Sequence, residues 1–112
     1  MTSISSLEYE FDTLWEYLYP DVDLVAEYIP IPGRRFKFDY CHLSSFVLIE
    51  CQGQIWHKGG HNTGKGLMRD YEKLNLAQAH GFCVFQLSPE MVTEDWLHLI
   101  AWTINERKSA KC

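Results

Sequence analysis

The sequence predicts an α/β fold: a single domain with a mixed four-stranded sheet flanked by helices, in the order α-β-β-β-α-β-α. Two observations predict it. Apolar residues recur at helical spacing near the start, in the middle and near the end of the chain, and the intervening segments have the short apolar patterns of strands. A length of 112 residues suits one modest core, which we expect to extend from about residue 7 to residue 105.

The first helix has an apolar stripe that ends before Pro20 and follows the candidate caps Ser5 and Ser6. The stripe consists of Leu7, Phe11, Leu14, Trp15 and Leu18. A strand-like segment over 24–29 comes next and stops at the turn-forming run 30–33, which contains two prolines and a glycine.

Two strands with different burial follow. Phe36, Phe38 and Tyr40 alternate with less apolar residues, which is typical of a half-buried strand. Segment 46–49 is continuously apolar, as in a central strand covered on both faces. The short connection over 42–45 predicts that the two strands pair, with Asp39 ending one strand and Glu50 ending the next.

The second half begins with a glycine-rich loop from Gly53 to Gly66. We expect a helix from about Leu67 to Gly81 and a short buried strand over 82–87. The expected inward stripe of this helix is Leu67, Tyr71, Leu74 and Gln78. Thr93 should cap a last helix, whose apolar residues are Trp96, Leu97, Ile100, Ala101 and Ile104.

Composition limits the class of protein. An apolar content of 46% argues against disorder, and no apolar run approaches the length of a membrane span or a secretion signal. The four cysteines form no CxxC pair, so we expect reduced thiols and a cytoplasmic location.

Charge is unevenly distributed along a chain of net charge −5. Residues 1–33 contain seven acidic residues and no Lys or Arg, whereas residues 34–73 contain seven basic and four acidic residues. The basic residues are Arg34, Arg35, Lys37, Lys58, Lys65, Arg69 and Lys73. A local basic patch is compatible with a polyanion such as DNA, and an ordinary solvated surface is the alternative.

Asp39 and Glu50 are the candidate catalytic carboxylates. If their strands pair, the two acids lie side by side, and a cation should sit between them. Mg²⁺ or Mn²⁺ suits Asp39, Glu50 and the backbone carbonyl of Cys51, because hard cations prefer oxygen ligands. Strand alternation places Gln52 on the same side as Glu50.

Several motifs together resemble the PD-(D/E)XK nuclease superfamily, and its small branch similar to very-short-patch-repair and phage endonucleases in particular. They are Asp39, Glu50-x-Gln52, Gly53 with Ile55-Trp56, His61, and Asp70-x-x-Lys73-x-Asn75. The resemblance spans roughly residues 8–92 and implies one nuclease-like domain over residues 1–112 with a restriction-endonuclease-like core. It also implies a bacterial or phage-infected cell as the setting. It departs from the family at Gln52, where the superfamily's name has Lys, and at Gly60, where the small branch tends to have Arg.

The resemblance implies a magnesium-dependent DNA endonuclease. In that reading Asp39 and Glu50 hold the metal, Gln52 orients water or substrate, and Lys73, His61 and the helix carboxylate Glu8 assist. The expected DNA-contacting residues are Arg34, Arg35, Lys65 and Lys73. A homodimer or higher homo-oligomer, or a partner protein that supplies specificity, would suit such an enzyme. The alternative is a catalytically weak nuclease-fold module for DNA binding or assembly, which Gln52 favours.

Simpler readings exist for each residue. Asp39 could be solvated in a turn, Gln52 could satisfy backbone groups, and Glu8 could belong to an acidic surface. Lys73 could form a surface ion pair with Asp70, one turn earlier. The stretch GGHNTGKG also approaches a phosphate-binding loop, but Gly66 replaces the Ser or Thr that such a loop needs, so we interpret it as a loop that leaves the catalytic strand.

Overall fold

Residues 6–53 and 64–110, the part of the chain that the computed structural model describes, contain three α-helices and four strands in the predicted order. They are α1 (Ser6–Leu18), β1 (Val25–Tyr28), β2 (Phe38–His42), β3 (Val47–Cys51), α2 (Gly64–Ala79), β4 (Cys83–Leu87) and α3 (Glu94–Ala110), with a 3₁₀ turn, η2 (Pro89–Met91), before α3. Trp56 and His61 lie outside the described residues.

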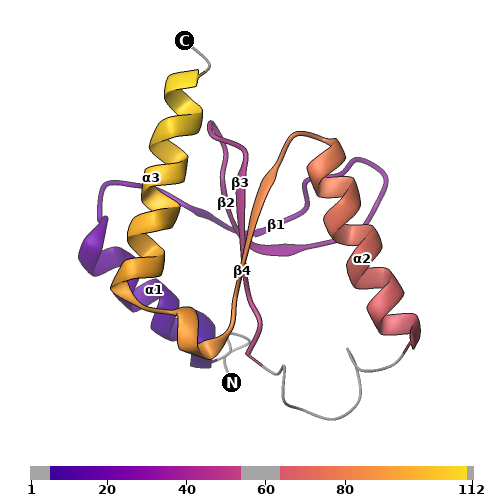
Figure 1. Cartoon of the computed structure of the whole chain (residues 1–112), viewed down its shortest axis with the longest axis horizontal. Helices are drawn as coiled ribbons and strands as arrows, with labels where there is room; N and C mark the ends of the chain where they lie inside the picture. Colours follow the sequence, from indigo (N-terminus) through magenta and orange to yellow (C-terminus); the bar gives the residue numbers. More distant parts are fainter. Residues whose placement is uncertain (1–5, 54–63, 111–112) are drawn as a thin grey trace.

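The strands form one mixed sheet in the order β1-β2-β3-β4. β2 is antiparallel to both β1 and β3, while β4 is parallel to β3 and is reached through α2. Helices α1 and α3 lie on one face of the sheet and α2 lies on the other (Figure 1). This arrangement confirms the predicted meander followed by a βαβ crossover.

The larger hydrophobic core lies between the sheet and the pair of helices α1 and α3. Its buried members are Phe11, Trp15, Tyr40, Val47, Ile49, Leu87, Leu97, Ile100 and Ile104. The predicted stripes of both helices are confirmed, because Leu14, Leu18, Trp96 and Ala101 pack against the same cluster. Thr93 caps α3 as expected, since its Oγ1 accepts the Trp96 N–H at 3.3 Å.

A smaller cluster on the α2 face consists of Phe38, Cys41, Leu48 and Ala77. Cys41, Cys51 and Cys83 all have free thiols and lie in strands, as expected. Within residues 6–53 and 64–110, no helix has the length and apolarity that crossing a bilayer requires.

The expected inward stripe of α2 is wrong at three of its four positions, because Leu74 is half-buried but Leu67, Tyr71 and Gln78 are exposed. Leu67 and Tyr71 are 42% and 54% exposed, and Ala77 is the residue of α2 that is fully buried. The helix also begins at Gly64, three residues earlier than expected, so Gly64–Gly66 belong to its first turn and not to a loop. Gly66, Asp70, Lys73 and Ala77 form its less exposed stripe. The helical period was correct, but polar side chains occupy the inward face, so apolarity marked the wrong side.

Candidate active site

Asp39 and Glu50 meet at one edge of the sheet. Tyr40 pairs with Ile49 in the β2–β3 register, and continuing this antiparallel register by one residue places Asp39 opposite Glu50. Asp39 is therefore near the start of β2 and not at its end, as the sequence suggested. The expected proximity is nevertheless confirmed, because in an antiparallel pair the start of β2 lies beside the end of β3.

The strand is irregular at Asp39. Phe38 packs on the α2 face and Tyr40 on the opposite face, although residues two apart in a regular strand share a face. Glu27, which the β1–β2 register places opposite Asp39, has φ of +54°, a value uncommon for residues other than glycine. The irregularity lets the Asp39 carboxylate turn toward the next strand, where its Oδ2 accepts the Cys51 N–H at 2.7 Å.

Negative charge accumulates around Asp39. The pKa of Asp39 is raised to about 7, and burial is the largest cause. The hydrogen bond from the Cys51 N–H lowers this pKa, whereas a hydrogen bond with Glu8 and the charges of Glu8 and Glu50 raise it. Glu8 of α1 is thus brought to the two strand carboxylates, as the resemblance implied. Three acids from α1, β2 and β3 converge here.

Glu50 is surrounded by donors from three elements. The ammonium of Lys73 on α2 forms an ion pair with Glu50 Oε2, and each of these side chains is only 14% exposed. Gln52 Nε2 donates to Glu50 Oε1 at 3.3 Å, and Gln86 Nε2 of β4 donates to the same oxygen at 3.4 Å. Lys73 is therefore not the surface lysine of the simpler reading. Its Nζ also lies 4.4 Å from the centre of the Phe38 ring.

Gln86 was missed by the sequence interpretation. It pairs with Glu50 in the parallel β3–β4 register. One signal could have found it: Gln86 is the only polar side chain besides Cys83 in the segment Cys83–Leu87. A polar residue in an apolar strand beside a catalytic strand is a reasonable candidate for contact with the site.

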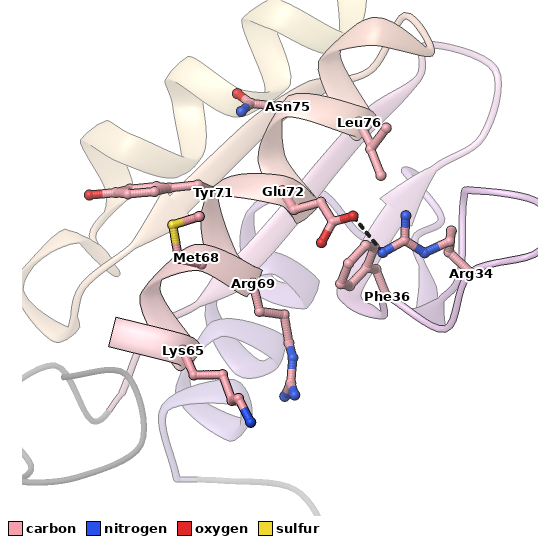
Figure 2. A pocket seen from close by; sticks show the side chains of 9 residues that line it. All are labelled: Arg34, Phe36, Lys65, Met68, Arg69, Tyr71, Glu72, Asn75 and Leu76. Carbon is pink, nitrogen blue, oxygen red and sulfur yellow. Dashed lines mark hydrogen bonds and ion pairs between the residues drawn. The ribbon is translucent and has the colours of Figure 1, made fainter. Parts of the chain in front are cut away.

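The predicted basic residues lie beside α2. Arg34 donates to Glu72 at 2.7 Å, and its guanidinium carbon lies 4.6 Å from the centre of the Phe36 ring. Arg34, Phe36, Lys65 and Arg69 contribute to a groove of about 850 Å³ (Figure 2). Arg35 lines a smaller neighbouring cavity of about 410 Å³.

Two of the side chains at this site, Asp39 and Glu50, offer the oxygen ligands that a hard divalent cation prefers. Asp39 and Glu50 offer carboxylate oxygens, and Mg²⁺ is usually bound through one or two carboxylates together with waters and substrate phosphates. In the described portion of the chain, no three His, Cys, Asp or Glu side chains are grouped to hold a metal ion. Burial raises the pKa of the Cys51 thiol to about 12, and the negative charge of Asp39 is the next largest cause. The thiol therefore stays protonated at neutral pH, and Cys51 would bind a metal through its backbone carbonyl.

The fold is similar to that of a nuclease catalytic domain. The solved structure in question is the catalytic domain of the homing endonuclease I-Bth0305I, which superposes with a TM-score of 0.70 at 12% sequence identity. The match covers 93% of this chain and 98% of that one. No family model matches the sequence, and no curated protein matches it. At this identity the similarity establishes the fold.

Proposed function

We propose that this protein is a metal-dependent endonuclease that hydrolyses phosphodiester bonds in DNA. One observation carries the proposal: Asp39 of β2 has two acidic neighbours, Glu8 of α1 and Glu50 of β3, and the Lys73 ammonium of α2 pairs with Glu50. Burial raises the pKa of Asp39, and the neighbouring carboxylates Glu8 and Glu50 raise it further, a cost that a bound cation would relieve. The similarity of the fold to a homing endonuclease catalytic domain supports the same reaction class.

The proposed ligands of Mg²⁺ or Mn²⁺ are the carboxylates of Asp39 and Glu50 and the carbonyl of Cys51. A bound ion would supply a water nucleophile at neutral pH and stabilise charge on the phosphate. The hydrogen bond from the Cys51 N–H holds Oδ2 of Asp39. Gln52 and Gln86 fix the orientation of Glu50 through its Oε1.

Lys73 is the proposed hydrogen-bond donor to the scissile phosphate. In hydrolysis, water forms a new bond to phosphorus while one ester P–O bond breaks, and negative charge grows on the phosphoryl oxygens. An ammonium beside the scissile group stabilises that charge, and the neutral amide of Gln52 brings no positive charge of its own. Lys73 would exchange its contact with Glu50 for a phosphate oxygen. Glu8 assists from α1, and His61 remains a proposed proton or phosphate contact from sequence alone.

A cleavage assay tests the proposal. Labelled linear, flap, four-way and single-stranded DNAs should be cut by the wild-type protein with Mg²⁺ or Mn²⁺ and not with EDTA. Asp39→Asn and Glu50→Gln should each lose at least about 100-fold in single-turnover rate. Glu10→Gln, an exposed acid of α1, is the matched control and should cleave normally. Cleavage that persists in both site variants would exclude this site as the catalytic one.

A second function has support in one observation. Glu50 is already paired with Lys73, Gln52 and Gln86, which is the arrangement expected of a site that no longer needs a metal. The chain would then be a DNA-binding or assembly module, alone, as a homo-oligomer or with a partner protein. Tight DNA binding without cleavage under any metal condition would favour this alternative.

A further inference from the structure

A groove beside the candidate active site combines cations with aromatic and apolar side chains. It lies between α2 and the segment that precedes β2, with a volume of about 850 Å³. The lining residues that matter here are Arg34, Phe36, Lys65, Met68, Arg69 and Tyr71. In Figure 2, Lys65 and Arg69 extend in a similar direction from α2, while Arg34 approaches Glu72 from across the groove.

The groove is connected to the candidate active site through α2 and through the segment that leads into β2. On α2, Arg69 precedes Lys73 by four residues, so the two side chains are neighbours on the helix surface. Lys65, Arg69 and Lys73 form one basic row along the helix that ends at Glu50. On the other wall, Phe36 comes three residues before Asp39. A nucleic-acid strand held in this groove would therefore lead to the carboxylates.

The lining suits unpaired nucleotides better than an intact duplex. Bases inside a duplex are stacked on one another and cannot enter a side pocket, so a duplex backbone needs only a basic surface. Proteins that hold single strands combine a positively charged groove with aromatic side chains on which bases stack. Tyr71 and Met68 are 54% and 67% exposed here, and Arg34 lies over the Phe36 ring at 4.6 Å. These exposed apolar groups otherwise have no role in the core.

We propose that this groove binds an unpaired stretch of the DNA strand next to the scissile phosphate. This inference rests on the proposed function and adds the substrate class to it: DNA with a single-stranded segment, such as a tail or flap, in preference to a continuous duplex. Glu72 moderates binding because its carboxylate pairs with Arg34 within the groove.

Binding without cleavage tests the inference. Fluorescence anisotropy in EDTA would compare a labelled DNA single strand, the same strand in a blunt duplex, and a duplex with an unpaired tail. The wild type should bind the single strand and the tailed duplex at least about fivefold more tightly than the blunt duplex. Tyr71→Ala should remove this preference, because stacking on one aromatic side chain contributes about fivefold or more in affinity. Arg69→Gln should weaken binding, and Glu72→Gln should strengthen it.

Matched controls lie elsewhere on the molecule. Tyr17→Ala removes a tyrosine of α1 that is 78% exposed, and Lys108→Gln removes an exposed charge on α3. Neither should change the preference. Equal or tighter binding of the blunt duplex, or a Tyr71→Ala variant that keeps the wild-type preference, would overturn the inference.

The failure of this inference differs from the failure of the proposed function. Cleavage of blunt duplexes that Asp39→Asn abolishes and Tyr71→Ala does not affect would reject the groove and keep the nuclease. A Tyr71-dependent preference for unpaired DNA, with no cleavage of any substrate, would reject the nuclease and keep the groove.

Discussion

Lys73 and Glu50 form an ion pair between α2 and β3 in which each side chain is 14% exposed. A charge in such a place is costly unless it is paired, so each residue stabilises the other. The pair also places an ammonium beside Glu50, one of the two candidate metal-binding carboxylates. A single lysine can thus stabilise the resting protein and be ready to contact a phosphate.

Lys73→Met tests both roles at once. Methionine removes the ammonium that pairs with Glu50 and lies over the Phe38 ring, so we expect a loss of about 1–3 kcal/mol in the free energy of unfolding. Urea denaturation measures it, and Glu50→Gln in the same chain should recover part of the loss. Cleavage should fall by about 10²–10³, and Gln52→Lys should partly restore it if the two positions share one role. Full activity of Lys73→Met would make this lysine purely structural.

The raised pKa of Asp39 predicts that the free energy of unfolding depends on pH. Its pKa is about 7 in the folded protein and about 3.9 when unfolded. Between these values the folded state binds a proton that the unfolded state does not, so this residue's contribution to stability falls as pH rises from about 4 to about 7. Asp39→Asn cannot titrate. In EDTA, the unfolding free energy of Asp39→Asn minus that of the wild type should therefore increase between about pH 4 and about pH 7 and stay constant above about pH 7. A difference that is constant with pH would contradict the raised pKa.

At the scale of elements, α3 is fastened to two turns by Arg107. Its Nε donates to the Ser45 carbonyl and its second guanidinium nitrogen donates to the Gly81 carbonyl, both at 2.6 Å. These contacts join the β2–β3 connection, the α2–β4 connection and α3, which together hold the sheet in register at the end away from the candidate active site (Figure 1).

Arg107→Met should destabilise the fold without altering chemistry. Two charge-assisted hydrogen bonds would be lost, at a cost of about 1.5–3 kcal/mol in unfolding free energy. Lys108→Met on the next residue is the control and should change stability by less than about 0.5 kcal/mol. Cleavage measured well below the melting temperature should be normal in both variants. An unchanged denaturation midpoint for Arg107→Met would show that these contacts contribute little.

Element order and strand pairing were predictable because helical and strand periods in this chain seldom conflict. Leu7, Phe11 and Trp15 mark the inward face of α1 correctly, since that face is apolar throughout. The same reasoning failed for α2, whose inward face carries Asp70 and Lys73. Sequence spacing predicted that Asp39 and Glu50 would meet. It could not predict the partners of Glu50, because Gln86 reaches it only through the parallel β3–β4 register.

At the scale of the whole molecule, α1 and α2 differ in charge on opposite faces of the sheet. α1 contains Glu8, Glu10, Asp12 and Glu16 and no basic residue, whereas α2 contributes Lys65, Arg69 and Lys73 beside Asp70 and Glu72 (Figure 1). A net charge of −5 therefore coexists with a basic approach on the α2 side. DNA should be attracted to that side and repelled from the α1 side.

The salt dependence of DNA binding tests whether the basic residues on the α2 side contact phosphates. If Arg34, Arg35, Lys65 and Arg69 contact phosphates, the logarithm of the single-strand binding constant should fall against the logarithm of salt concentration with a slope of about −3. Lys65→Gln should make the slope shallower by somewhat less than one, while Lys108→Gln should leave it unchanged. A flat dependence would exclude a surface that follows the phosphate backbone.

The central claim is that Asp39 and Glu50 form a metal site for phosphodiester hydrolysis, and manganese titration by calorimetry tests it most directly. The wild type should bind Mn²⁺, more tightly above about pH 7 than below it, because the ion competes with the proton on Asp39. Asp39→Ala and Glu50→Ala, each checked for folding by circular dichroism, should abolish binding, and Glu10→Ala should retain it. Unchanged Mn²⁺ binding in both folded site variants would contradict the claim.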